Sequence, residues 1–188
     1  MSIDWIILIT HSEGEETGEL RIKSQNVFSH YHNRKKATEE SFDERGFFRT
    51  GDIVSIDSSD GFYKIVGRAS VDIIKSSGYK ISALEIEDVL ITMSQIREVA
   101  VVGVPSEQHG QTVGALVSLK EVRLRSYLML KGVQGEQLSL TEISDFCKDK
   151  LAPYKIPRVL ELVPAIPRNA MGKMNKKELV KLFRSQKS

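Results

Sequence analysis

The chain has 188 residues, of which 40% are hydrophobic and 28% are charged, and its formal net charge is +2. This composition is typical of a globular protein with one domain, or with one domain and part of a second. The charge is too balanced to predict a nucleic-acid partner or a membrane surface, and no apolar run reaches the roughly eighteen residues of a membrane span. Cys147 is the single cysteine, so no intrachain disulfide can form, and a reducing, intracellular compartment is favoured.

The first third of the chain predicts β-structure. Residues 6–9 form a short apolar run that suits a strand, and residues 12–16 suit a turn. From Gly18 onward, alternating apolar and polar side chains predict further strands. The other elements expected here are a strand at 20–22, a short helix at 33–42, a strand at 47–52 that ends in a turn, an Asp-Gly turn at 58–61 and a strand at 62–66.

The middle of the chain predicts a β-hairpin. Residues 71–74 are rich in β-branched side chains, which favour a strand. The Ser-Ser-Gly sequence at 76–78 is typical of a turn, and residues 79–81 would return as the second arm.

Three more strands are expected beyond the hairpin, at 96–104, 112–119 and 158–163. The first two are mostly apolar rather than alternating, which indicates burial on two faces of a sheet. Residues 122–136 lie between the second and third strands and are longer than a common connection.

Two capping boxes predict helix starts, one at Ser82 with Glu85 and one at Ser139 with Glu142. The first helix should run to about Met93. The second would bury Ile143, Phe146, Cys147 and Leu151 and stop at Pro153, and a last helix, capped by Asn175 with Glu178, would bury Leu179, Leu182 and Phe183.

Three motifs occur in order along the chain: FRTGD at 48–52, GRASVDIIK at 67–75 and PRNAMGK at 167–173. Together they resemble the adenylate-forming enzymes, the superfamily of acyl-CoA synthetases, luciferases and peptide-synthetase adenylation domains. The resemblance runs from about Gly18 to Phe183 and corresponds to roughly the last third of a full enzyme. The second motif is most similar to the malonyl-CoA synthetase group, but fatty-acyl and aryl-CoA ligases are close to it and stay open as alternatives.

The resemblance implies an α+β fold in two parts. Residues 1–66 would be the β-rich tail end of the large AMP-binding domain, with 1–17 atypical, and residues 67–70 would be the hinge. Residues 71–188 would form the C-terminal domain, a β-hairpin plus a three-stranded sheet with flanking helices and an insertion near 122–136. The hinge would turn this domain between two half-reactions.

Lys173 is the catalytic residue that the resemblance implies. In adenylation a carboxylate attacks the α-phosphate of ATP, so two anions approach each other. A fixed ammonium group between them offsets the repulsion and stabilises the charge of the transition state. Spacing alone favours an exposed surface lysine instead, because Lys176, Lys177 and Lys181 lie nearby.

The resemblance also implies the contacts with ATP. Asp52, with Thr50 beside it in the motif, would accept hydrogen bonds from the ribose hydroxyls, because an ionised carboxylate is acceptor-only. Arg68 would add a second contact to the ribose or a phosphate. From the residues alone, a turn aspartate and a surface salt bridge are the alternatives.

Lys75, Gly78 and Tyr79 would face the pantetheine arm of CoA after the domain turns, although Lys75 also suits a solvated hairpin position. His30 and His32 are two apart, a spacing that could place both on one strand face as metal ligands. No other potential ligand clusters there, so no metal site is expected.

The intact enzyme would convert a carboxylic acid, ATP and CoA into acyl-CoA, AMP and pyrophosphate. The family's Ser/Thr/Gly-rich phosphate-binding loop and its Mg²⁺-binding motif are not found in this sequence, so we expect that the chain alone is not a competent ligase. A non-catalytic truncated isoform or interaction module is the alternative. By resemblance the compartment would be the mitochondrial matrix, with the cytoplasm as the alternative, and no targeting signal is visible.

Overall fold

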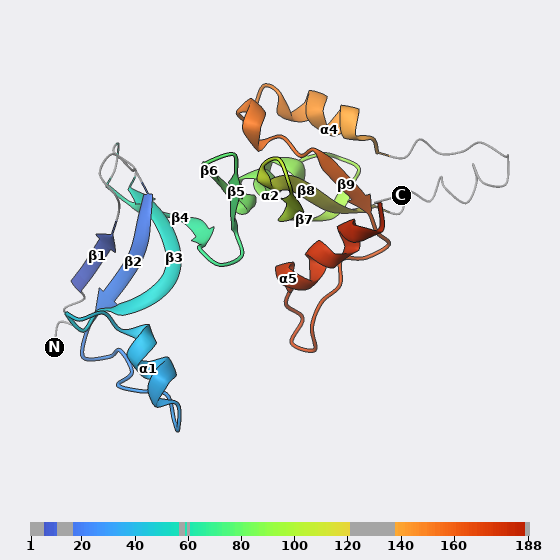
Figure 1. Cartoon of the computed structure of the whole chain (residues 1–188). Coiled ribbons are helices and arrows are strands. Elements are labelled where there is room, and N and C mark those ends of the chain that lie inside the picture. The colour runs from blue at the N-terminus through green and yellow to red at the C-terminus, as the bar shows by residue number, and fades with distance from the viewer. Residues whose placement is uncertain (1–5, 11–16, 57–58, 60, 121–137, 187–188) are drawn as a thin grey trace, which may run out of the picture. The chain divides into compact units, whose positions relative to one another are not determined.

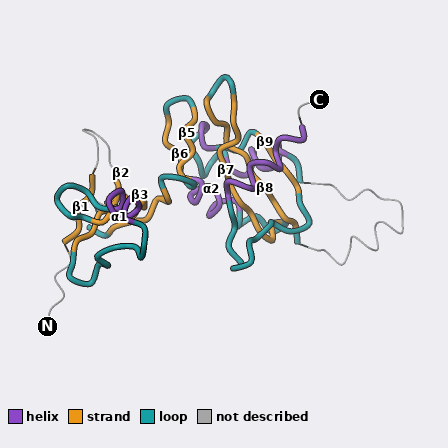
Figure 2. Tube along the Cα trace, turned by 60° about the horizontal axis from the view of Figure 1, so that its bottom comes forward, coloured by secondary structure: helices purple, strands orange, loops and turns teal. Residues whose placement is uncertain are grey.

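The structure is a computed structural model, and it describes residues 6–10, 17–56, 59, 61–120 and 138–186. The chain divides into two compact units, Met1–Ser70 and Val71–Ser188. Strands and helices occur in both units (Figure 2). The predicted turn at 12–16, half of the turn at 58–61 and the insertion near 122–136 lie outside the described residues.

The first unit is built on a four-stranded antiparallel sheet in the order β1-β2-β3-β4 (Figure 1). Its elements are β1 (Ile6–Thr10), β2 (Thr17–Lys23), α1 (Lys35–Ser41), β3 (Phe48–Ile56) and β4 (Tyr63–Arg68).

The prediction that the strand at 47–52 ends in a turn is wrong, because β3 continues beyond the FRTGD motif to Ile56. The register between β2 and β3 passes from the pair Glu19–Ile53 to the pair Arg21–Arg49, so residues 50–52 bulge out of the ladder. Gly51 has a φ of 74°. Its conformational freedom is therefore used for a bulge inside a strand, and not for a chain reversal.

The second unit is built on a five-stranded sheet. Its strands are β6 (Tyr79–Ser82), β5 (Ile73–Ser76), β8 (Gly110–Leu119) and β7 (Ile96–Ser106), in that order, with β9 (Val159–Leu162) paired in parallel with β8. Ser76 of β5 pairs with Gly110 of β8, so the predicted hairpin and the three predicted strands form a single sheet. The predicted α+β class is confirmed.

Helices cover both faces of this sheet. They are α2 (Ala83–Leu90), α4 (Leu140–Cys147), η1 (Pro153–Lys155), α5 (Lys176–Leu179) and η2 (Val180–Gln186). Ile86 of α2 and Ile143 of α4 share one buried cluster, whereas Leu179 and Phe183 share the other with Ala100 of β7. Figure 1 shows α4 and α5 on opposite sides of the strands. The expected burial of β7 and β8 on two faces is therefore confirmed.

Both predicted serine caps accept their hydrogen bond, but at α2 the Glu85 carboxylate pairs with Lys155. Ser82 Oγ accepts a hydrogen bond from the Glu85 N–H at 3.2 Å. At α4 the box is reciprocal: Ser139 Oγ accepts from the Glu142 N–H at 3.2 Å, and the Ser139 N–H donates to the Glu142 carboxylate at 2.8 Å. The backbone N–H of Ser139 thereby lowers the pKa of Glu142 below its usual value.

Other predicted helix boundaries differ. Helix α4 ends at Cys147, ahead of Pro153, which instead begins η1. Asn175 precedes α5 in an extended conformation, but its side chain makes no capping hydrogen bond, so the predicted cap is wrong. The start of α5 is held instead by ion pairs of Lys176.

Candidate functional site

Lys173 lies at the end of a tight turn in the second unit. The Gly172 N–H donates to the Asn169 carbonyl and the Asn169 N–H donates to the Lys173 carbonyl, both at 2.9 Å. The Asn169 side-chain oxygen accepts from the Lys173 N–H at 2.9 Å and from the Met171 N–H at 3.0 Å. Gly172 has a φ of 76°, which glycine adopts without strain. Because Lys173 is exposed, the turn presents an ammonium group to solvent.

Arg168 fastens this turn to the sheet. Its Nη1 donates to the Gly172 carbonyl at 3.1 Å, and its Nη2 donates to Glu98 Oε1 at 2.8 Å. The hydrogen bond from Arg168 lowers the pKa of Glu98 below its usual value. The turn is therefore tied to β7, where Glu98 lies.

The Lys176 side chain is largely covered, in contrast to the exposed side chains of Lys173 and Lys177. Its side chain is 12% exposed, and its Nζ lies 2.6 Å from Asp72 Oδ1 and 2.8 Å from Glu87 Oε1. Both contacts are ion pairs of the Lys176 ammonium group. Lys176 and buried Leu179 are three residues apart on α5 and share its inward face.

Asp52 and Arg68 meet in the first unit. They are directly opposite each other in the ladder of β3 and β4, and Arg68 Nε donates to Asp52 Oδ1 at 3.1 Å. The Arg68 side chain is 66% exposed and that of Asp52 is 28% exposed. An exposed salt bridge contributes at most about 1 kcal/mol, so a ligand can displace it at low cost.

Thr50 shapes the bulge that carries Asp52. Its hydroxyl donates to the Leu20 carbonyl at 2.8 Å and accepts from the Asp52 N–H at 3.0 Å. Both hydrogen bonds hold residues 50–52 away from the regular ladder. The threonine therefore orients the backbone of Asp52.

The tip of the β5–β6 hairpin is a two-residue turn. Ser77 has a φ of 48° and Gly78 a φ of 86°, and the flanking residues Ser76 and Tyr79 are paired. Positive φ at both central residues defines a type I′ turn, which matches the twist of the two strands. A Cβ atom at Gly78 would meet no atom within 4 Å, so the tip is open to a ligand.

The hairpin is held by His109 in the turn before β8 and by Gln111 at the start of β8. The Ser77 N–H donates to the His109 carbonyl at 3.0 Å, and Ser77 Oγ lies 2.9 Å from His109 Nδ1. The Lys75 N–H donates to Gln111 Oε1 at 2.7 Å. The sequence reasoning did not find His109 or Gln111, because nothing local to the hairpin signals a partner so far along the chain.

Tyr79 stacks on Tyr154 of η1. The ring centroids are 4.3 Å apart and the planes are 11° from parallel. Tyr79 is 52% exposed and Tyr154 is 38% exposed. The next residue, Lys155, pairs with Glu85 at 2.6 Å and 2.7 Å. Lys75, Gly78 and Tyr79 therefore share one exposed end of the sheet, while Lys173 comes from a different loop.

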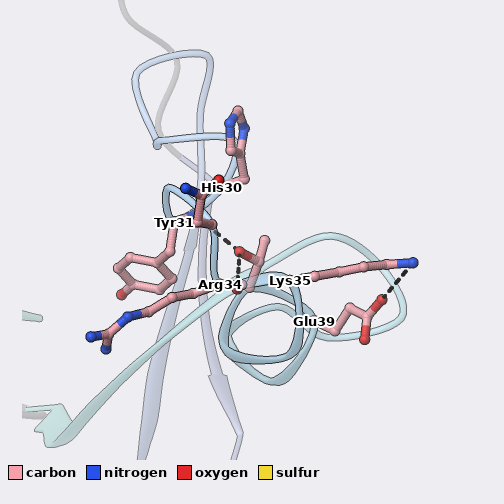
Figure 3. Close-up of a pocket in the computed structure, with 7 residues that line it drawn as sticks. His30, Tyr31, Arg34, Lys35 and Glu39 are labelled. Carbon is pink, nitrogen blue, oxygen red and sulfur yellow. Dashed lines mark hydrogen bonds and ion pairs between the residues drawn. The ribbon is translucent and has the colours of Figure 1, made fainter.

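The first unit also has an open hollow of about 610 Å³ beside α1 (Figure 3). Its lining consists of exposed or half-exposed side chains: His30, Tyr31, Asn33, Arg34, Lys35, Thr38 and Glu39. None of the predicted site residues belongs to this lining. His30 and His32 lie in a loop, so their placement on one strand face is wrong.

Across the described part of the chain, no group of three or more His, Cys, Asp or Glu side chains is placed to hold a metal ion. In that same part, no helix has both the length and the apolar character needed to cross a membrane.

Comparison with known proteins defines the class. Residues 85–173 match the family described as AMP-binding enzyme C-terminal domain. The structure resembles ATP-bound MatB from Rhodopseudomonas palustris, with a TM-score of 0.76 and 28% identity over 96% of this chain and 34% of that one. It also resembles the o-succinylbenzoate CoA synthetase MenE from Bacillus subtilis, solved with an acyl-adenylate intermediate, with a TM-score of 0.76 and 32% identity over 93% and 33%. Residues 85–173 are therefore similar to the AMP-binding enzyme C-terminal domain, as the motifs predict.

Within that class the sequence is similar to malonate–CoA ligases. It is 43% identical over 175 residues to the mitochondrial malonate–CoA ligase ACSF3 of Homo sapiens and 40% identical over 175 residues to the malonate–CoA ligase of Arabidopsis thaliana. Each alignment covers 93% of this chain and 28% of the relative. The chain thus spans little more than a quarter of the length of these curated relatives.

Proposed function

We propose that this chain functions as part of an ATP-dependent acid–thiol ligase that forms acyl-CoA, AMP and pyrophosphate, and that malonate is the acid. The observation that carries the proposal is Lys173, which the Asn169–Gly172 turn presents to solvent at the end of the matched region. The names of the similar ligases support malonate. Fatty and aryl acids are the alternatives.

Lys173 is the group we assign to adenylation. Its exposed ammonium would lie between the attacking carboxylate and the α-phosphate and offset their repulsion. The Asn169 side chain and the Arg168 guanidinium fix the backbone on either side of Gly172, so the charge is held on a rigid support.

Asp52 and Arg68 are the groups we assign to ATP. The carboxylate would accept hydrogen bonds from the ribose diol, and the exposed guanidinium beside it would take the second hydroxyl or a phosphate. Mg²⁺ would accompany ATP, and we assign no residue of this chain to it.

The β5–β6 hairpin is the part we assign to CoA. Gly78 leaves the tip open, Lys75 supplies a positive charge near it, and Tyr79 supplies a half-exposed ring. In this proposal residues 67–70 are the hinge that exchanges the Lys173 turn for the hairpin between the two half-reactions. The compartment we propose is the mitochondrial matrix, in keeping with the mitochondrial relatives.

The test is to titrate the purified 188-residue chain with CoA and, separately, with ATP–Mg²⁺. Binding is measured by calorimetry and by changes in amide chemical shifts. We expect CoA to bind and to shift the amides of residues 75–80. The chain alone should form no malonyl-CoA from ATP, malonate and CoA. Absence of CoA binding, or shifts confined to the hollow beside α1, would overturn the assignment of the hairpin.

A non-catalytic interaction module is the second candidate. It is favoured by β4, where Phe62 beside the strand and Tyr63 and Ile65 within it are 72%, 49% and 64% exposed. An apolar, exposed strand at the end of the sheet order suits pairing with another polypeptide. A chain that binds neither CoA nor ATP but elutes as a dimer, with Ile65→Lys restoring the monomer, would support this candidate instead.

A further inference from the structure

A largely buried ion-pair cluster joins three segments of the second unit: the turn before β5, helix α2 and helix α5. The Lys176 ammonium lies between the carboxylates of Asp72 and Glu87, at 2.6 Å and 2.8 Å. The three side chains are only 12%, 13% and 18% exposed. Glu87 Oε1 also accepts the N–H of Val101 in β7 at 2.7 Å, and the Asp72 carbonyl accepts the N–H of Ala83 at the start of α2.

A cluster of this kind is a costly way to stabilise a fold. Removing three charges from water carries a large desolvation penalty, and well-packed apolar side chains often stabilise as much or more. What charges provide in addition is a fixed arrangement, because each must keep its partner or remain buried and uncompensated. The cluster therefore holds its elements in one relative position.

The chain positions of the three residues indicate which elements need to be fixed. Asp72 is two residues beyond Ser70, where the first unit ends. Lys176 is the first residue of α5 and lies three residues after Lys173. The cluster thus connects the beginning of the second unit to the turn that presents Lys173.

We infer that Lys176 is a positioning residue for Lys173. Its ion pairs with Asp72 and Glu87 anchor one end of the Lys173 turn, as the Arg168–Glu98 pair anchors the other end. When residues 67–70 change conformation, Lys173 is carried with Asp72 as part of one rigid body. The inference rests on the proposed function, in which Lys173 acts on the adenylating substrates.

The first experiment measures amide hydrogen exchange in the purified chain and in three variants: Lys176→Met, Lys176→Arg and Lys177→Met. Methionine keeps the apolar stem of Lys176 and removes its charge. We expect exchange of the Gly172 and Lys173 amides, both hydrogen-bonded to Asn169, to become about tenfold faster in Lys176→Met because the turn opens locally. Arginine should restore most of the protection.

Lys177→Met is the matched control, since Lys177 is exposed on the same helix. Its exchange should match that of the wild-type chain. Unchanged exchange at residues 169–173 in Lys176→Met, or an equal increase at Val117 in the core of β8, would overturn the inference. If Lys176→Met does not fold, Asp72→Asn decides the question in the same way, with faster exchange expected at Gly172 and Lys173.

The second experiment measures both half-reactions in the full-length ligase that we propose for this sequence. Lys176→Met should lower kcat for adenylation about tenfold or more with KM for ATP nearly unchanged, because the variant misplaces Lys173 without removing a contact with ATP. Lys176→Arg should recover most of that loss, and thioester formation from a supplied acyl-adenylate should be spared. Equal loss in both half-reactions would contradict a positioning role. If the proposed function itself were wrong, the wild-type chain would bind no CoA, and this result is independent of the Lys176 variants.

Discussion

Replacing Gly78 with alanine separates the two roles that the hairpin turn combines, a strained backbone and an open surface. Gly78 has a φ of 86°, and a Cβ atom there would meet nothing within 4 Å. The cost to folding is therefore backbone strain alone, about 1–2 kcal/mol for an L-residue in the left-handed region. Alanine also restricts the unfolded chain, which returns about 0.4–1 kcal/mol. The net loss of unfolding free energy should be about 1 kcal/mol.

Gly172→Ala is the matched control, because Gly172 has a φ of 76° and equally open space. Urea unfolding of the two variants should give similar losses of about 1 kcal/mol with unchanged m-values. Calorimetric titration should then separate them: the added methyl group weakens CoA binding only at Gly78. A loss above about 3 kcal/mol in Gly78→Ala would refute the view that the site is unobstructed. Equal CoA affinities in the two variants would refute the placement of CoA at the hairpin.

Further predictions concern helix α4. Ser139→Ala should lower the free energy of unfolding by about 1 kcal/mol, because it removes the oxygen that accepts the Glu142 N–H hydrogen bond. Ser139→Thr keeps a hydroxyl and should retain most of the wild-type stability. Equal stability of the alanine variant and the wild type in urea would contradict the cap. Burial raises the pKa of the Cys147 thiol above its ordinary 9.0, although Lys150 partly opposes this, so a thiol reagent should label native Cys147 far more slowly than the unfolded chain. The pKa of the thiol is higher in the folded chain than in the unfolded chain, so the stability that the protonated thiol contributes is complete below pH 9 and is lost as the pH rises through the folded pKa. The Cys147→Ser variant should lack this loss of stability at alkaline pH. Fast labelling of native Cys147 would show that the site is open and contradict the prediction.

The structural features that depend only on residues close together in the chain could be predicted from the sequence. The serine caps at Ser82 and Ser139 require only a hydroxyl and the backbone N–H three positions later, and both hydroxyls accept that bond. The hairpin turn follows from Ser77-Gly78 between two β-rich segments. Asn175 shows the limit of local reasoning, because its helix starts from ion pairs with Asp72 and Glu87, far away in the chain.

The geometry of the candidate site depends on contacts that no local pattern contains. The motif identifies Asp52, but its pairing with Arg68 follows from the register of β3 and β4 and from the bulge that Thr50 stabilises. Lys176 has the sequence context of an exposed lysine, and only the packing of Leu179 against the sheet turns it inward. Tyr154 lies opposite Tyr79 for a similar reason, since η1 returns to the hairpin only in the folded chain.

The central claim is that Lys173 acts in adenylation and that the hairpin acts in thioester formation. The most direct test is to replace Lys173 with alanine in the full-length ligase that we propose for this sequence and to measure the two half-reactions separately, with Lys177→Ala as the control. We predict that adenylate formation falls by about 10²–10³-fold, the loss typical of one electrostatic group at a transition state, while thioester formation from supplied malonyl-adenylate stays within about twofold. Equal loss of both half-reactions, or adenylation at the wild-type rate, would contradict the account.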